Sequence, residues 1–420
     1  MIMDKEKIWL SSPHMGTQEM ENVINAFATN WLAPLGPEVD AFEKSIIQFT
    51  GRGHVAALNS GTSALHLGLV LLDIKPGDYV ICQSMTFAAS ANPIIYQGGI
   101  PVFVDSEPDT WNMCPKALET AILACLTGCI NPYGEIENRN LYSHNSSPLY
   151  PGKKPKAIIP VHLYGMPANM KEIMAIAHHY DIPVLEDAAE AMGSTYQGQA
   201  CGTFGTMGIY SFNGNKIITT TSGGALISQE EELINRARFL STQAKDAAPH
   251  YQHSEIGYNY RISNVLAGIG RGQMEVLNLR IKQRRENFGF YADFFSDIPG
   301  VTLQVEPNND YFSNHWLTGI LIDPELTGGI TREILRLALA KENIEARPLW
   351  KPLHLQPVFE KYPYFGEKIS EDLFEKGLCL PSGSNLTPFD FERIFQVFSE
   401  VFHKVPLSPF RNSHFYNALA

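Results

Sequence analysis

Short apolar runs alternate with helical segments between residues 54 and 187, and this alternation constrains the fold more than any other feature of the chain. Five short apolar runs predict strands: HVAALN, DYVICQ, IPVFVD, KAIIPVHL and IPVLEDA. Two intervening segments have helical spacing, SGTSALHLGLVLLDI and NMKEIMAIAHHYD, and AASANPIIYQG predicts a shorter helix. Strands that alternate with helices predict an α/β fold with a mainly parallel sheet covered on both faces. Ligands of such sheets gather at the carboxyl ends of the strands.

The chain has 420 residues, which is long enough for two or more domains. We expect a large domain over residues 1–296 and a smaller α+β domain over residues 297–420. In the smaller domain, HWLTGILID and IEARPLW predict strands, while TREILRLALAKEN and FDFERIFQVFSEVFH predict helices. The tail from about residue 406 to 420 is expected to be loosely held.

Three segments of the large domain depart from the alternating pattern. An N-terminal arm is expected over residues 1–36. Residues from about 127 to 155 are rich in Asn, Ser, Pro and Gly, which indicates an insertion or a long loop. A linking helix is expected over about 261–296, in which three glycines indicate close packing or a kink: Gly268, Gly270 and Gly272.

The composition narrows the class of protein. The net charge of −12 argues against nonspecific nucleic-acid binding, although a local basic pocket can still bind an anionic small ligand. No apolar run approaches the ~20 residues needed to span a membrane, and MIMDKEKIWLSSP lacks the apolar core of a signal peptide. The six cysteines fit no zinc or disulfide framework. We therefore expect a cytoplasmic enzyme with no metal, nucleic-acid or membrane partner.

A first candidate site segment is NSGTSAL, between a predicted strand and an apolar helix. Gly61 lets the backbone approach a ligand, and Thr62 and Ser63 offer hydroxyls and amides at a helix N-terminus, which suits a phosphate. Ordinary capping of the helix by Ser or Thr is the alternative, and for this segment taken alone it is the more common role.

Two further segments follow strands. In LEDAAEAMG, Glu186 and Asp187 end an apolar strand, where a carboxylate can pair with a buried cationic nitrogen or cap a turn. In SMTFAASAN, Phe87 stands among small residues, where it can stack on an aromatic ligand or serve as a core phenylalanine.

The fourth segment, SFNGNKIITTTSGGAL, places Lys216 in a polar turn followed by small residues. A lysine amine forms a Schiff base with an aldehyde only when it is unprotonated, and desolvation or a nearby cation favours that state. A phosphate cup, a stacking aromatic ring, a carboxylate and an amine are together the groups that pyridoxal phosphate requires. The four segments jointly predict a site for that cofactor.

The segments SGTSAL, EDAAEAMGS, SFNGNK and GYNYRIS together resemble the DegT/StrS sugar-nucleotide aminotransferases, which are fold-type I pyridoxal-phosphate enzymes. The resemblance covers roughly residues 8 to 405. Within the family, the stretches around SSPHMGTQEMENVINAF and STQAKDAAPHYQH look similar to the bacillosamine-pathway branch, as does the insertion. That branch aminates C4 of a UDP-linked 2-acetamido-2,6-dideoxy-4-keto-hexose, with L-glutamate as the implied donor.

The resemblance also implies residue roles. Lys216 would form the internal aldimine and shuttle the proton, Asp187 would pair with the pyridine nitrogen, and Phe87 would stack on the ring. Thr62, Ser63 and Ser211 would hold the phosphate. Asn259 in GYNYR would reach the phosphate in the neighbouring subunit, so the site would be shared in a homodimer. Glu190 stands where relatives often carry Gln or His near the phenolic oxygen of the cofactor.

Substrate contacts are less constrained by the sequence. His354 in KPLH resembles a histidine near the substrate in relatives. Lys245 and Arg261 supply cations near GYNYR that suit a diphosphate. The remaining candidates for substrate contact are His14, Trp31 and His253, for which packing or surface roles are the alternative.

Three other functions compete. Some relatives use pyridoxamine phosphate to remove a sugar hydroxyl, but they carry histidine at the position of Lys216. A non-catalytic sugar-nucleotide-binding regulator would not need Lys216 and Asp187 intact. An NAD-dependent dehydratase or epimerase would need a glycine-rich fingerprint, and LNSGTSAL is not G-x-G-x-x-G.

Overall fold

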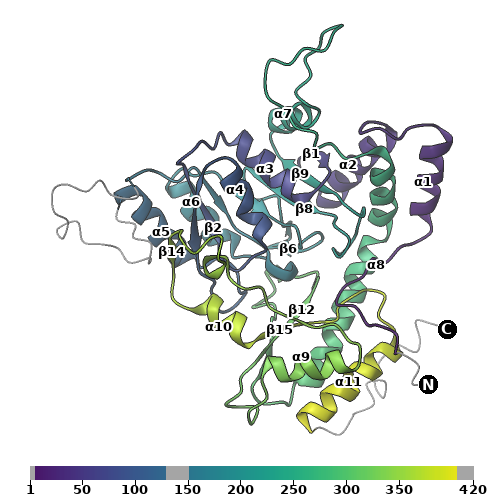
Figure 1. Cartoon of the computed structure of the whole chain (residues 1–420), viewed down its shortest axis with the longest axis vertical. Coiled ribbons are helices and arrows are strands. Elements are labelled where there is room, and N and C mark those ends of the chain that lie inside the picture. The colour runs from purple at the N-terminus through teal and green to yellow at the C-terminus, as the bar shows by residue number, and fades with distance from the viewer. Residues whose placement is uncertain (1–4, 129–150, 404–420) are drawn as a thin grey trace.

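The computed structural model describes residues 5–128 and 151–403, and a large twisted sheet lies at its centre (Figure 1). Two four-stranded sheets, ordered β1-β9-β8-β5 and β14-β3-β2-β4, continue into each other. Parallel bridges from Ile158 to Val184 and from Val161 to Asp187 join β4 to β5. The strands are β1 (His54–Leu58), β2 (Tyr79–Gln83), β3 (Ile100–Val104), β4 (Ala157–Ile159), β5 (Leu185–Asp187), β8 (Met207–Ser211), β9 (Gly224–Ser228) and β14 (Tyr364–Phe365).

The sheet is mixed but mainly parallel, as the alternating pattern predicts. β2 pairs in parallel with β3 and β4, β5 with β8, and β14 with β3. Only β9 among these strands runs antiparallel to its neighbours β1 and β8. The carboxyl ends of β1, β2, β5 and β8 therefore lie at the same edge of the sheet.

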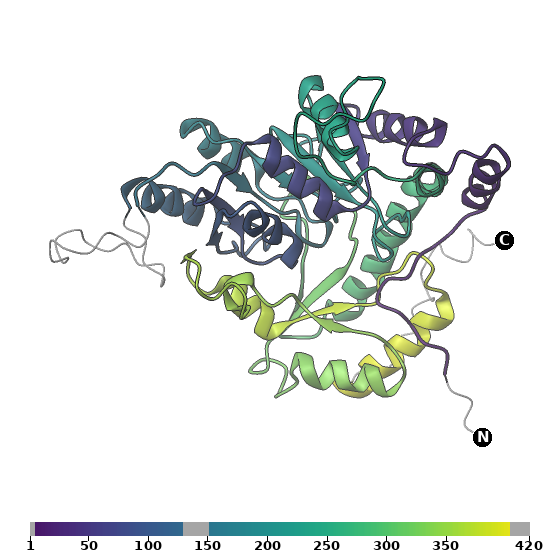
Figure 2. The same cartoon turned by 45° about the horizontal axis from the view of Figure 1, so that its top comes forward.

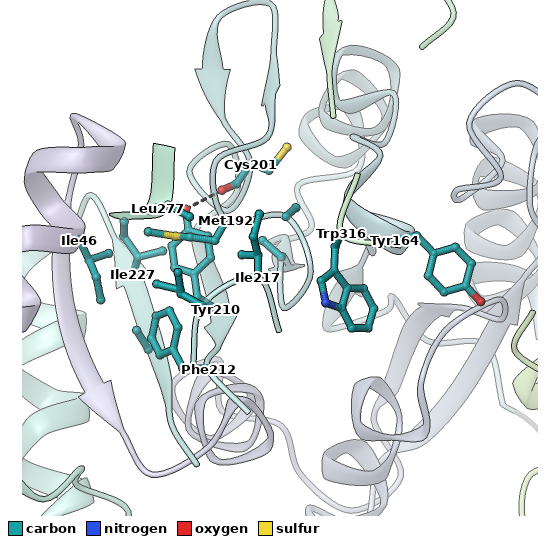
Figure 3. Packing of buried hydrophobic residues seen from close by; sticks show 14 of the residues in the cluster. Ile46, Tyr164, Met192, Cys201, Tyr210, Phe212, Ile217, Ile227, Leu277 and Trp316 are labelled. Atoms are coloured by element: carbon teal, nitrogen blue, oxygen red, sulfur yellow. Dashed lines mark hydrogen bonds between the residues drawn. The ribbon is translucent and has the colours of Figure 1, made fainter. Parts of the chain in front are cut away.

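Helices cover both faces because successive strand residues point to opposite sides. Ala56 and Leu58 pack in one core, with α3 (Gly61–Leu71), α4 (Asn92–Tyr96) and α7 (Glu231–Ser241). Val55 and Ala57 pack in another, with α2 (Pro37–Thr50) and α8 (Asn264–Phe295), partly drawn in Figure 3. The core around Ile81 includes α5 (Pro115–Thr127) and α6 (Met170–His179). The structure confirms the expected α/β fold.

The smaller C-terminal part is an antiparallel sheet covered by helices. Its strand order is β10 (Val301–Leu303), β12 (Thr318–Ile322), β15 (Gly377–Leu380) and β13 (Arg347–Pro348). A separate core joins this sheet to α9 (Arg332–Lys341) and α11 (Pro388–Phe402), and α10 (Ile369–Lys376) precedes β15. A three-stranded sheet is formed by β6 (Thr195–Tyr196), β7 (Gln199–Ala200) and β11 (Tyr311–Phe312).

α8 connects the two parts along its 32 residues (Figure 1). A Cβ atom at Gly270 would stand 2.7 Å from both Phe42 and Thr220, so this glycine marks close packing rather than a break in the helix. α1 (Gln18–Ala28) lies within the expected arm and packs on α8, where the Asn22 side chain donates to the Gly268 carbonyl at 2.9 Å.

Two segments pack on the part of the structure that lies on the other side of the expected domain boundary at residue 296. Ile8 forms a parallel bridge with Ile344, so the start of the arm lies on the C-terminal part (Figure 2). In the other direction, β14 adds to the large sheet beside β3. Most of the expected insertion and the expected loose tail fall outside the described residues. None of the described helices is both long enough and apolar enough to cross a membrane.

Candidate active site

A cavity of about 600 Å³ opens at the carboxyl edge of the large sheet. Side chains from the ends of four strands line it, together with the N-terminal arm and the C-terminal part. Seven of the residues expected at the cofactor line this cavity: Gly61, Thr62, Phe87, Asp187, Glu190, Ser211 and Lys216. Segments separated by more than 150 residues in sequence thus meet at one place, as the position of parallel strand ends requires.

Lys216 lies in the turn after β8, with its side chain largely buried. Its Nζ is 3.0 Å from Oε1 of Glu190 and 4.1 Å from the centre of the Trp316 ring. The backbone N–H of Tyr164 donates to the other Glu190 oxygen at 2.8 Å. Burial raises the pKa of Glu190 to about 7, although the ammonium group of Lys216 opposes that rise. The amine therefore faces a carboxyl group that can exchange a proton near neutral pH.

Asp187 ends β5 with its side chain buried and fixed. Its Oδ2 accepts a hydrogen bond of 2.6 Å from the Ser90 hydroxyl, and Oδ1 accepts one from the Ala189 N–H at 3.1 Å. Because the Ser90 proton is used in this way, the Thr86 hydroxyl donates to Ser90 Oγ at 2.7 Å. The hydrogen bonds from the hydroxyl groups hold this buried carboxylate in place in the cavity wall.

The first turn of α3 forms another wall. Ser60 caps the helix by accepting from the Ser63 N–H at 3.0 Å, and the Ser63 hydroxyl donates to Asn59 Oδ1 at 2.6 Å. A Cβ atom at Gly224 would come within 2.4 Å of the Gly61 nitrogen, so only glycine lets β9 pack against this turn. Gly61, Thr62 and Ser60 line the cavity, whereas Ser63 lies outside its lining, with its N–H bonded to the Ser60 cap and its hydroxyl bonded to Asn59.

The residues present suit pyridoxal phosphate. A helix N-terminus and hydroxyl groups favour a phosphate, a buried carboxylate favours a ring N–H, and a lysine amine can engage an aldehyde. Phe87 is 61% exposed at the rim of the cavity and is therefore available to a planar ring. This donor set, rather than any one member, makes the cavity fit the cofactor.

Several expected substrate residues lie elsewhere in this chain. His354 is buried with its Nδ1 atom 2.7 Å from Ser84 Oγ, and its ring stacks on Tyr364. Arg261 is paired with the buried Glu43, which also pairs with Arg238, and it donates to the Ala57 carbonyl, so its guanidinium group is held away from the cavity. Neither side chain lines the cavity in this chain.

The other candidates have local roles in the described chain. His14 contacts Ser384 Oγ at 3.1 Å, Lys245 lies over the Tyr251 ring, and His253 contacts the Gln243 carbonyl. Trp31 is partly exposed, and Asn259 bonds to Gln243 at 3.1 Å from an exposed position. These residues lie outside the wall that this chain alone provides.

Several residues of the cavity wall were not among those expected from the sequence. Trp9 and Ser11 come from the arm, Trp316 precedes β12, and Arg347 and Trp350 follow α9. Arg347 and Trp350 stand in IEARPLW, which the sequence shows only as a predicted strand. A tryptophan in each of these segments was the one available signal, and it is weak because tryptophan is also common in cores.

Comparison with known proteins identifies the family. The model of the DegT/DnrJ/EryC1/StrS aminotransferase family matches residues 13–399. The chain belongs to this family. It is 48% identical over 404 residues to EpsN of Bacillus subtilis (strain 168), a protein assigned to the pyridoxal phosphate-dependent aminotransferases, covering 95% of this chain and 97% of EpsN.

Two further relatives extend the comparison. The chain is 32% identical over 402 residues to a GDP-perosamine synthase of Caulobacter vibrioides (strain ATCC 19089 / CIP 103742 / CB 15), covering 95% of this chain and all of the relative. A crystal structure of a DegT DnrJ EryC1 StrS aminotransferase from Brucella abortus matches with a TM-score of 0.79 and 30% identity, covering 91% of this chain and 95% of that one. The protein is a pyridoxal-phosphate-dependent sugar aminotransferase of the DegT family.

Proposed function

We propose that this aminotransferase moves the amino group of L-glutamate to C4 of a UDP-linked 2-acetamido-2,6-dideoxy-4-keto-hexose, a reaction of bacillosamine-type glycan biosynthesis. The meeting of Lys216 and Asp187 at one cavity carries the reaction class. The motifs that resemble the bacillosamine-pathway branch carry the choice of sugar.

Each residue has a physical task in this proposal. Pyridoxal phosphate supplies the aldehyde and the electron-withdrawing ring that carry an amino group between donor and acceptor. Lys216 holds the aldehyde and moves a proton at Nζ. Asp187 keeps a proton on the ring nitrogen, and Glu190 accepts a hydrogen bond from the Lys216 amine.

A cation on the wall supports an anionic substrate. Arg347 lines the cavity beside Glu345, and the two side chains are paired at 2.6 Å. Arg347 is 70% exposed, so a diphosphate can compete with Glu345 for its guanidinium group. Of the two cations expected from the sequence, Lys245 would have to reach the site from a second subunit, whereas Arg261 is held by Glu43.

A shared site in a homodimer is part of the proposal. Asn259 is exposed and lies outside the wall of its own chain, and its side chain bonds to the equally exposed Gln243, so a partner subunit can reach it. α1 exposes the large apolar side chains of Met20, Ile24 and Phe27, and such a patch favours an interface.

The main alternative is a substrate sugar that is linked to a nucleotide other than UDP. Relatives with 30 to 34% identity are named GDP-perosamine synthases, so a GDP-linked keto sugar is a candidate substrate for this chain as well. The two alternatives share the lysine and the cofactor and differ in the acceptor.

The test offers purified enzyme L-glutamate with UDP-, GDP- and dTDP-linked 3-keto and 4-keto sugars, and identifies the products by mass spectrometry and NMR. We expect the 4-amino product from the UDP-linked 4-keto-HexNAc, and no product from Lys216→Ala. Amination of another nucleotide sugar, with the UDP-linked 4-keto-HexNAc untouched, would overturn the substrate assignment.

A further inference from the structure

The carbonyl group of Asn215, the residue just before Lys216, accepts two hydrogen bonds from outside the large sheet. The Ser11 hydroxyl of the arm donates at 2.8 Å, and the indole Nε1–H of Trp316 donates at 2.8 Å. We propose that Ser11 and Trp316 are positioning residues that hold the segment 212–221 around Lys216, the lysine turn, so that Lys216 is placed for the cofactor only when the arm is docked. The inference rests on the proposed role of Lys216.

Trp316 contacts both the backbone next to Lys216 and the amine at the end of the Lys216 side chain. Its indole N–H fixes the backbone before Lys216, while its ring lies 4.1 Å from Nζ. Figure 3 shows Trp316 beside Tyr164 and near Ile217, the residue after the lysine. Because Trp316 is only 2% exposed, its ring is held by packing and can serve as a fixed reference for the amine.

The Asn314 side chain ties this segment to Glu190. Its Nδ2 donates to the Glu190 carbonyl at 2.8 Å, and its Oδ1 accepts from the Trp316 N–H at 2.8 Å. The segment 314–316 therefore spans from the backbone of Glu190 to the backbone before Lys216. It keeps the carboxyl group and the amine in a fixed relation.

Arg284 of α8 anchors the arm side of the same arrangement. Its guanidinium group is fully buried, and it donates to Ser11 Oγ at 3.0 Å and to the carbonyls of Trp316 and Ser382. Burial lowers the pKa of Arg284 to about 9, with Arg280 contributing. No carboxylate among residues 5–128 and 151–403 pairs with it. A buried cation is costly without a carboxylate, and these bonds to oxygen atoms offset part of that cost, while the Nε atom has no hydrogen-bond partner among the described residues.

The arm carries this arrangement to the C-terminal part. Ile8 pairs with Ile344, and the Leu10 N–H donates to Glu345 Oε2 at 3.1 Å. Glu345 in turn pairs with Arg347 on the cavity wall. Docking of the arm therefore couples the lysine turn to the wall that would face the substrate.

The matched control is Ser12, the next residue of the arm. Its hydroxyl contacts the Asn385 side chain and not the lysine turn. Ser12→Ala thus removes a hydroxyl from the same arm without touching the Asn215 carbonyl. Trp316→Phe removes the second donor while it keeps an aromatic ring.

The first readout is amide hydrogen exchange of the cofactor-free protein. Exchange in residues 212–221 should rise about 2- to 10-fold in Ser11→Ala and in Trp316→Phe, the change expected for one lost hydrogen bond, and stay unchanged in Ser12→Ala. Unchanged exchange in both test variants, or an equal rise in Ser12→Ala, would overturn the positioning role.

The second readout follows the attachment of pyridoxal phosphate to the cofactor-free protein by borohydride trapping and mass spectrometry. Attachment at Lys216 should slow several-fold in Ser11→Ala and in Trp316→Phe, and should keep the wild-type rate in the control Ser12→Ala. Attachment at wild-type speed in both would overturn the proposal. Trapping at another lysine in the wild type would instead overturn the role of Lys216, whereas the exchange readout tests the contact with Asn215 by itself.

Discussion

Among single residues, Glu190 combines burial with a position beside the Lys216 amine. Burial raises its pKa to about 7, so the folded protein holds a proton there that the unfolded chain releases above its ordinary pKa near 4.5. The contribution of this group to stability is complete below pH 4.5 and is lost as the pH rises toward 7.

Glu190→Gln should remove that dependence on pH. The free energy of unfolding of the cofactor-free variant, relative to that of the wild type, should increase by about 1–3 kcal/mol between pH 5 and pH 8. Urea denaturation at both pH values measures the difference. A difference that is constant or falls with pH would show that the Glu190 pKa is not raised.

Asp187→Asn should keep the shape of the side chain while removing the charge that stabilises a protonated ring nitrogen. We expect kcat to fall by about 10²- to 10⁴-fold, because the lost interaction acts in the transition state. Steady-state kinetics with saturating cofactor measures the change. A decrease of less than fivefold would rule out this role.

Site residues that follow strand ends could be predicted from the sequence. Site residues that belong to segments far away in the chain could not. Lys216, Asp187 and Phe87 stand next to strand-like runs, so their meeting at one cavity follows from a parallel sheet. Trp316 and Ser11 are 101 and 204 residues away from Asn215, and no local pattern connects them. Arg261 was expected near a diphosphate, but the buried carboxylate of Glu43 holds it in this chain.

At the scale of elements, α8 packs closely against α2 and against Thr220 because Gly270 has no side chain. Gly270→Ala would place a methyl group 2.7 Å from Phe42 and Thr220, whereas a Cβ atom at Gly289 in the same helix would meet no neighbouring atom within 4 Å. Gly270→Ala should therefore destabilise the protein by about 1–3 kcal/mol through overpacking.

The matched variant Gly289→Ala should stabilise the protein by about 0.5–1 kcal/mol, because alanine favours the helix over glycine. Thermal or urea unfolding of both variants measures the contrast. Equal effects of the two substitutions would contradict the close packing of α8 at Gly270.

The elements with strong periodicity were predictable, whereas β14 and the pairing of the arm were not. The central strands and α3, α6, α9 and α11 follow from apolar spacing that local sequence displays. β14 has two residues, and the arm pairs through a single bridge at Ile8, so neither carries a period. Their places depend on tertiary partners far away in the chain.

At the scale of the whole molecule, the exposed Asn259 predicts that two subunits complete each site. Mixing Lys216→Ala protomers with Asn259→Ala protomers should restore activity, because a mixed dimer contains one site with both native groups. Activity assays after confirmed subunit exchange measure the recovery. No recovery above either parent would contradict the shared site.

Borohydride reduction of the holoenzyme identifies the lysine that carries the cofactor, which we propose to be Lys216. Reduction fixes the pyridoxyl group to the amine that holds it, and peptide mapping by mass spectrometry identifies that residue. We predict the label on the peptide that contains Lys216, and no specific label in Lys216→Ala. A label on a different lysine of the wild-type holoenzyme would contradict the assignment.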